Sequence, residues 1–209
     1  MTEQILFIDN ASILLTEERE RTDIVIGAPH HSVGGIKTLP CVEHLDADEN
    51  SGFIARQIAE TLKLSSIIAC NYWLDPNKNL STDYSMKIAQ WTPKYLIEIH
   101  GHGAKAIGDN QIEVTAGSLS RNTFSKLFAS TLRAKLSINE ELKNYVVTGD
   151  FSKLHFKGTK SATINYEGWI PLQIELPPSL RLNPTDNKLP NCALDLTKYL
   201  IETITEVCK

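Results

Sequence analysis

Strand-like apolar runs alternate with amphipathic helical segments along most of this chain, and this rhythm constrains the fold more than any other feature. The run Asp23–Ala28 is apolar and β-branched, which is typical of a strand buried on both faces of a sheet. From Ser51 to Leu62 the apolar residues instead recur at three- and four-residue spacing, which predicts a helix. A further strand is expected at Ser66–Cys70. This order of strand, helix and strand indicates a βαβ arrangement.

The same patterns predict elements along the rest of the chain. The other expected strands are a weaker one at Ala11–Leu15, then Tyr95–Ile99, Tyr145–Val147, Ala162–Tyr166 and Leu172–Leu176. The other expected helices cover Tyr84–Trp91, Phe124–Leu136 and Leu194–Val207. No repeat, low-complexity tract or linker divides the 209 residues, so we expect one α/β domain over residues 1–209. Its central sheet should be mostly parallel or mixed.

Charge and composition exclude several classes of protein. With 21 basic against 25 acidic side chains the net charge is −4, and no basic stripe is present, which argues against a nucleic-acid partner. Met1–Asp9 lacks the features of a signal peptide, and no apolar run approaches the roughly 18 residues of a membrane span. The cysteines form no CxxC pair, which is typical of a reducing compartment. We therefore expect a cytoplasmic protein without a membrane partner.

Histidines gather where two of the expected strands end. Asp23–Ala28 is followed by Pro29-His30-His31, and Tyr95–Ile99 by His100-Gly101-His102, so four of the six histidines lie at these two places. The carboxyl ends of parallel strands are where such sheets bind ligands. A loop histidine can also be satisfied by hydrogen bonds alone. Neutral imidazole is nevertheless the commonest metal ligand, and a catalytic zinc site takes three protein ligands plus water.

Carboxylates near these strand ends could complete a metal site. Asp46-Ala47-Asp48-Glu49 stands just before the helix expected from Ser51, where acidic residues are also favoured electrostatically. Glu175 interrupts the apolar strand Leu172–Leu176. A carboxylate there must be paired, solvated or functional, because burying it without a partner is costly. At a sheet edge it would simply face solvent.

These pieces, in this order, resemble the N-formylglutamate amidohydrolase family of zinc-dependent hydrolases, which shares a fold with zinc carboxypeptidases. Ala28–Ser32 resembles the family's strand end Ser-Pro-His-Ser-Gly, and Ile97–His102 resembles its segment Asp-Leu-His-Ser/Gly-His. Asp75–Asn79 is similar to Asp-Leu-Asn-Arg-Asn/Asp, and Gln173–Leu176 to a late Gln-x-Glu-Leu/Ile segment. The resemblance extends from about Ile24 to Arg181. It implies a single-domain, three-layer α/β sandwich of the zinc carboxypeptidase-like class.

The resemblance also implies roles for individual residues. One Zn²⁺ ion would be held by His30, Asp48 and His100, and Glu175 would be the general base. The doubled histidine leaves His30 or His31 as the first ligand, because neighbours on a strand face opposite sides. Asp48-Glu49-Asn50-Ser51 is similar to the Glu-x-x-Thr of carboxypeptidases, which favours Asp48 over Glu49.

Substrate contacts follow from the same comparison. Asn77 and Lys78 would bind a substrate carboxylate, with Lys78 standing where the family has an arginine. His102 and Arg181 are candidates for stabilising the developing oxyanion. The expected activity is hydrolysis of an amide bond in a carboxylate-bearing compound, such as N-formylglutamate, another N-acyl amino acid, a γ-glutamyl compound or a small peptide.

Two other classes of function stay open at this point. The first is a protein that keeps the fold and binds a metal or ligand without catalysis, for which Glu175 would have no use. The second is a nucleophilic hydrolase based on Ser32 or Cys41, although no Gly-x-Ser-x-Gly segment is present.

Overall fold

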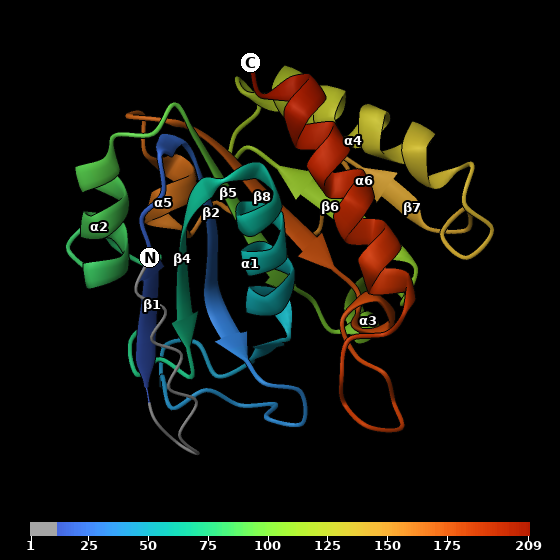
Figure 1. Cartoon of the computed structure of the whole chain (residues 1–209), viewed down its shortest axis with the longest axis horizontal. Coiled ribbons are helices and arrows are strands. Elements are labelled where there is room, and N and C mark those ends of the chain that lie inside the picture. The colour runs from blue at the N-terminus through green and yellow to red at the C-terminus, as the bar shows by residue number, and fades with distance from the viewer. Residues whose placement is uncertain (1–11) are drawn as a thin grey trace.

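The computed structural model describes residues 12–209, which build a sheet with helices on both faces (Figure 1). Met1–Asp9, on which the expectation about secretion rests, lies outside the described residues, as does Ala11. The sheet has eight strands. In chain order they are β1 (Ile13–Glu17), β2 (Arg21–Ser32), β3 (Asp48–Glu49), β4 (Leu64–Cys70), β5 (Tyr95–Gly101), β6 (Gln111–Thr115), β7 (Val146–Thr148) and β8 (Ile170–Leu176).

The sheet is mixed, with a parallel centre. Its order is β1-β4-β2-β5-β8-β6-β7, and the short β3 pairs with the end of β2. Strands β4, β2, β5 and β8 run parallel, whereas β1 and β6 are antiparallel to their neighbours β4 and β8. The carboxyl ends of the four central strands therefore meet at one edge, as the sequence predicts.

Helices cover the two faces and bury two apolar cores. They are α1 (Ser51–Leu62), α2 (Asp83–Trp91), α3 (Ala104–Ile107), α4 (Asn122–Leu136), α5 (Ala162–Asn165) and α6 (Cys192–Val207), with a short 3-10 helix at Pro178–Leu180. Helices α1, α4 and α6 pack on one face and share the larger core, whereas α2 contributes to the core on the other face. This arrangement confirms the predicted three-layer α/β sandwich.

One predicted element is wrong, and the short β3 and α3 and the longer β6 were not predicted. Ala162–Tyr166 is not a strand: Ala162–Asn165 forms the single helical turn α5, because the Ser161 hydroxyl accepts a hydrogen bond from the amide of Ile164 and caps the turn. Strand β6 was not predicted. Glu113 breaks its apolar pattern, and its pairing with β8 is a long-range contact.

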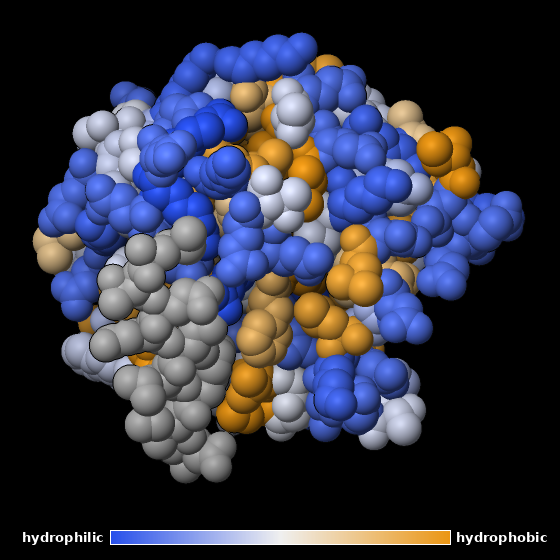
Figure 2. Space-filling model, in the orientation of Figure 1, coloured by the Kyte–Doolittle hydropathy of each residue, from blue (hydrophilic) through white to orange (hydrophobic). Residues whose placement is uncertain are grey.

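The polarity of the surface and the lengths of the helices agree with the expectations from composition. The face seen in Figure 2 is mainly hydrophilic, with hydrophobic residues in small separate groups. Among residues 12–209 no helix is both long and apolar enough to cross a bilayer. All four cysteines, at positions 41, 70, 192 and 208, are free thiols.

Candidate metal centre

Strands β2 and β5 bring two imidazoles together at the carboxyl edge of the sheet. His30 comes from β2 and His100 from β5, and their ring centroids lie 5.2 Å apart in an edge-to-face arrangement. Both side chains are about 95% buried. Because each histidine stands on a strand of the parallel centre, the backbone fixes where the two rings meet.

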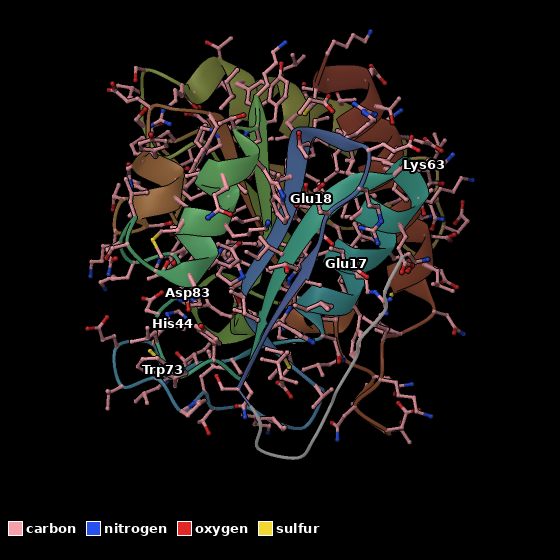
Figure 3. All side chains as sticks on the ribbon, turned by 60° about the vertical axis from the view of Figure 1, so that its left-hand side comes forward. Glu17, Glu18, His44, Lys63, Trp73 and Asp83 are labelled. Carbon is pink, nitrogen blue, oxygen red and sulfur yellow. The ribbon has the colours of Figure 1, made fainter. Side chains whose placement is uncertain are left out.

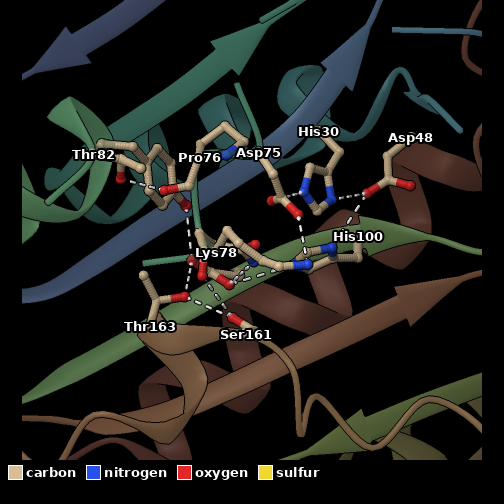
Figure 4. Close-up of polar contacts among 12 residues, drawn as sticks. His30, Asp48, Asp75, Pro76, Lys78, Thr82, His100, Ser161 and Thr163 are labelled. Atoms are coloured by element: carbon tan, nitrogen blue, oxygen red, sulfur yellow. Dashed lines mark hydrogen bonds and ion pairs between the residues drawn. The ribbon is translucent and has the colours of Figure 1, made fainter. Parts of the chain in front are cut away.

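The third member of this cluster is Asp48, delivered by the short strand β3. This strand pairs with the end of β2, with Asp48 opposite His31. Its Oδ2 atom lies 3.6 Å from Nδ1 of His30 and 3.3 Å from Nδ1 of His100 (Figure 4). Two imidazole nitrogens and one carboxylate oxygen therefore converge on one buried point.

The donor atoms fit a zinc ion. A tetrahedral site with ligand distances of about 2.0–2.1 Å places its donor atoms about 3.3 Å from one another. The observed separations from Asp48 are 3.3 and 3.6 Å. Nδ1 of His30 and Oδ2 of Asp48 are buried and lack a hydrogen-bond partner. Leaving such atoms unpaired costs about 1–3 kcal/mol each, and a bound cation would satisfy both.

The far nitrogens of the two histidines are occupied by other carboxylates. Nε2 of His30 lies 3.0 Å from Oδ1 of Asp75, and Nε2 of His100 lies 3.3 Å from Oε2 of Glu98. A histidine that binds a metal almost always donates its other ring N–H to such a group. Both Nδ1 atoms are thus left to face Asp48.

Charge in the cluster favours a cation. Burial by itself would lower the pKa of both histidines, but Asp48 and Asp75 outweigh it and raise the pKa of His30. Asp48 and Glu98 likewise raise the pKa of His100 well above its ordinary value. Burial works against ionisation of Asp48, yet His100 and His30 hold its pKa far below the usual range. A divalent ion would take the place of these protons.

The two ambiguities of the sequence have clear geometric answers. His31 points to the opposite side of β2, where its ring packs edge-to-face on Phe53 and burial lowers its pKa to about 3. Glu49 turns away from the cluster and accepts a hydrogen bond of 2.7 Å from the amide of Gly35. Of each pair, only His30 and Asp48 belong to the cluster with His100.

Glu175 lies beside His100 in the sheet. The two residues are direct partners in the parallel register of β5 and β8. The side-chain amide of Gln173 donates a hydrogen bond of 2.6 Å to Oε1 of Glu175. Burial raises the pKa of Glu175, and His100 and Gln173 oppose that rise. A carboxylate with a raised pKa binds a proton more readily than an exposed one.

A cavity of about 540 Å³ opens above these residues. His30, His100, Gln173 and Glu175 are part of its wall. Its other lining residues come from three loops and are Glu43, His44, Asp75, Asn77, Lys78 and the segment 155–161. The segment contributes Lys157 and Lys160, so that with Lys78 the loops supply three lysines to the wall against two carboxylates, Glu43 and Asp75.

The two predicted substrate residues differ in their surroundings. The side chain of Lys78 is 43% exposed, and its Nζ atom lies 3.9 Å from Oδ2 of Asp75. Asn77 is buried, and its side-chain amide donates a hydrogen bond of 3.1 Å to Oε2 of Glu98. Lys78 is therefore partly exposed in the cavity wall with one long contact to Asp75, whereas the amide of Asn77 already binds a carboxylate of the protein.

The two predicted oxyanion residues do not line the cavity. Arg181 is buried, and its guanidinium donates to the main-chain oxygens of Leu176, Glu49 and His102, at 3.1, 2.7 and 3.2 Å. The ring nitrogens of His102 lie 2.8 Å from the carbonyl of Gln111 and 3.2 Å from that of Gly103. Both side chains bind backbone around the site.

Three side chains of the site were missed from sequence. Asp75 and Glu98 contact the two histidines of the cluster, and His44 stacks on His30 with ring centroids 3.6 Å apart. Burial and the neighbouring His30 lower the pKa of His44 to about 4. Figure 3 shows His44 and Trp73 at the same end of the sheet. Glu98 could have been found from the sequence, because, like Glu175, it is a carboxylate inside an apolar strand.

The mixed eight-stranded sheet and its covering helices define the fold as a three-layer α/β sandwich. No known family profile and no curated protein sequence matches the chain. Among solved structures, the chain is similar to an N-formylglutamate amidohydrolase from Ralstonia eutropha JMP134, with 11% identity, a TM-score of 0.61, and coverage of 93% of this chain and 96% of that one.

Two further solved structures have the same fold. A bacteriophage poly-gamma-glutamate hydrolase is 13% identical, with a TM-score of 0.57 and coverage of 97% of this chain and 91% of that one. A gene product of Agrobacterium tumefaciens is 13% identical, with a TM-score of 0.55 and coverage of 96% and 98%. The likeness to all three is one of fold over nearly the whole of both chains.

Proposed function

We propose that this protein is a metal-dependent amidohydrolase with one Zn²⁺ ion held by His30, Asp48 and His100. The observation that carries the proposal is the convergence of two Nδ1 atoms and one carboxylate oxygen at a buried point, two of them without a hydrogen-bond partner. When bound, the ion would lower the pKa of a water molecule and polarise the scissile carbonyl.

In this proposal Glu175 is the general base. It is the register partner of His100, it lines the cavity, and Gln173 fixes the orientation of its carboxylate. Glu175 accepts a proton from the attacking water and delivers it to the leaving amine. A non-catalytic binding protein of the same fold, the alternative, would need no buried carboxylate at this place.

Lys78 is proposed to bind a carboxylate of the substrate. It is half-exposed in the cavity wall, and Lys157 and Lys160 add positive charge on the opposite loop. A lysine attracts an anion as a point charge without the bidentate geometry of arginine. The substrate would be an N-acyl amino acid such as N-formylglutamate, a γ-glutamyl compound or a small peptide. Two solved structures with this fold, the N-formylglutamate amidohydrolase and the poly-gamma-glutamate hydrolase, support this choice of glutamate compounds.

For His102 and Arg181 we propose a supporting role. Their polar atoms face main-chain oxygens, so that they hold the loops around the site together. The oxyanion role implied by the family resemblance would require these hydrogen bonds to be exchanged for the substrate. The cytoplasmic location expected from the sequence stays a prediction.

Metal analysis combined with one isosteric substitution tests the function. Purified protein is assayed for zinc and for hydrolysis of a panel of N-acyl amino acids and γ-glutamyl compounds. Glu175→Gln should bind zinc and lose at least about a hundredfold in kcat, as expected for a general base. The matched control is Glu113→Gln on β6, a buried carboxylate that accepts main-chain N–H groups of His155 and Phe156.

The outcomes separate the two functional classes. Hydrolysis by metal-free protein, or full activity of Glu175→Gln, would contradict the proposal. Zinc binding by the wild type without hydrolysis of any compound in the panel would favour the binding protein. A loss of activity in Glu113→Gln as large as in Glu175→Gln would mean that disturbing the β6–β8 pair or the cavity segment 155–161 is enough to explain the effect, without proton transfer by Glu175.

A further inference from the structure

A second buried carboxylate, Glu98, lies directly behind the metal centre. It stands on β5 two residues before His100, on the same face of the strand, and is 0% exposed. Four side chains surround it. Its Oε1 atom accepts hydrogen bonds from the hydroxyls of Tyr84, at 3.1 Å, and Thr163, at 2.9 Å. Its Oε2 atom faces Asn77 Nδ2 at 3.1 Å and His100 Nε2 at 3.3 Å.

The chemistry of these partners fixes the proton on His100. A carboxylate has only acceptors, so each group that contacts it must donate. Two hydroxyls donate to Oε1 of Glu98, and one amide and one ring nitrogen donate to Oε2. When a metal ion replaces the proton between His100 and Asp48, the remaining ring proton of His100 therefore resides on Nε2, and Nδ1 carries the lone pair that faces Asp48. This is the tautomer that a metal ion at the His30, Asp48 and His100 cluster requires.

The sequence makes room for this arrangement at Gly27. This glycine is the register partner of Glu98 on the neighbouring strand β2. A Cβ atom at position 27 would overlap the hydroxyl oxygen of Tyr84 and lie 3.3 Å from Cγ of Glu98. Glycine weakens a strand interior and often marks the close approach of another group. Here it allows Tyr84 of α2 to reach Glu98 across the strand.

Three separate parts of the chain meet at this carboxylate. Tyr84 comes from α2, Asn77 from the loop before it, and Thr163 from α5. Asn77 and the segment that leads into α5 also belong to the cavity wall. The loops that shape the cavity are thus tied to the same group that orients His100.

We propose that Glu98 is a positioning residue that sets the metal-binding tautomer of His100, held in place by Tyr84, Asn77 and Thr163. This inference rests on the proposed function, because it assumes that His100 is a metal ligand. It assigns Asn77 to the support of the metal centre instead of to the substrate carboxylate.

Metal affinity and a spectroscopic signature test the proposal independently of activity. Zn²⁺ affinity is measured by competition with a chromophoric chelator, and the visible absorption spectrum of the Co²⁺-loaded protein reports ligand geometry. Glu98→Gln keeps the shape of the side chain, but its amide nitrogen can donate to Nε2 and so favours the wrong tautomer. We expect zinc affinity about 10- to 100-fold weaker and an altered Co²⁺ spectrum.

Tyr84→Phe provides a milder variant, because it removes one donor to Glu98 and leaves every charge in place. Loss of one hydrogen bond should weaken zinc binding by about two- to tenfold. Glu113→Gln is the matched control, since Glu113 is also a buried carboxylate with hydrogen-bonded oxygens on a neighbouring strand. It should leave the zinc affinity and the Co²⁺ spectrum unchanged.

His100→Ala distinguishes failure of this inference from failure of the proposed function. If His100→Ala binds zinc like the wild type, the metal centre itself is placed wrongly. If His100→Ala loses zinc while folded Glu98→Gln and Tyr84→Phe both keep wild-type affinity and spectrum, the role of Glu98 is overturned. Should Glu98→Gln not fold, Tyr84→Phe decides alone: an unchanged affinity and spectrum refute the proposal.

Discussion

Replacing Arg181 by methionine should destabilise the fold far more than it affects the chemistry of the folded protein. The side chain is 3% exposed, and its guanidinium donates to three main-chain oxygens, at distances from 2.7 to 3.2 Å. Methionine fills a similar volume with no donor, so all three oxygens lose the guanidinium, although that of Leu176 still accepts from the amide of His102 at 3.0 Å. Glycine at position 101 leaves the space that the guanidinium occupies, because a Cβ atom there would overlap it.

The size of the effect follows from these contacts. Hydrogen bonds to a charged group contribute about 1.5–3 kcal/mol each, so three of them exceed about 4 kcal/mol. Removing a buried guanidinium also relieves a desolvation cost of a few kcal/mol, which offsets part of the loss. Arg181→Met should therefore lower the free energy of unfolding by about 2–4 kcal/mol.

Urea unfolding of the metal-free protein, followed by circular dichroism, measures this change. Arg121→Met is the control, because Arg121 hydrogen-bonds Ser118 and the carbonyl of Tyr166 in more exposed surroundings. It should cost less than about 1 kcal/mol. The reasoning is refuted if Arg181→Met unfolds at the same urea concentration as the wild type and its folded fraction has lost activity. Arg181 would then act on the reaction, as the family resemblance implies.

Three further predictions concern substrate binding by Lys78, the pKa of Glu175 and the packing of the hydrophobic core. Lys78→Met should raise KM for carboxylate-bearing amides with little change in kcat, and leave KM unchanged for analogues without a carboxylate, as steady-state kinetics would show; an equal rise for both would exclude carboxylate binding. Because Gln173 lowers the raised pKa of Glu175, and the base must be unprotonated, Gln173→Leu should move the acid limb of kcat/KM to higher pH; a shift to lower pH would contradict this sign. Phe128→Ala, at a fully buried position of α4, should cost about 3–5 kcal/mol in urea unfolding, whereas Leu127→Ala, at a position 52% exposed, should stay within about 0.5 kcal/mol; equal losses would disprove the assignment of the core.

Local patterns predicted most of the fold because periodicity reports which face of an element is buried. Helix α1 runs over the predicted Ser51–Leu62, and β5 begins at the predicted Tyr95. The wrong prediction of a strand at Ala162–Tyr166 arose because local periodicity did not decide the structure there. Its β-branched residues favour a strand, but the cap by Ser161 and the contact of Thr163 with Glu98 stabilise a helical turn. The cap by Ser161 is local, but the contact of Thr163 with Glu98 joins residues 65 positions apart, and no local pattern contains it.

The candidate site also has features that local sequence predicts and features that depend on long-range contacts. Histidines at two strand ends and a glutamate in an apolar strand are visible in the sequence, because strand order alone brings such residues to one edge of a parallel sheet. Which histidine of the pair faces inward, and which nitrogen of His100 is free, depends on the side chains around them. Asp75 and Glu98 settle this for His30 and His100.

The alternation of elements, the edge of the sheet that carries the candidate site, and the residue types gathered there follow from the chain's local patterns. That the amide of Asn77 binds Glu98 and that Arg181 binds three carbonyls emerges only in the folded chain. Burial follows local periodicity, whereas these hydrogen bonds depend on the position of a partner elsewhere in the chain. The sequence gives the type of each side chain, but the fold decides which group that side chain contacts.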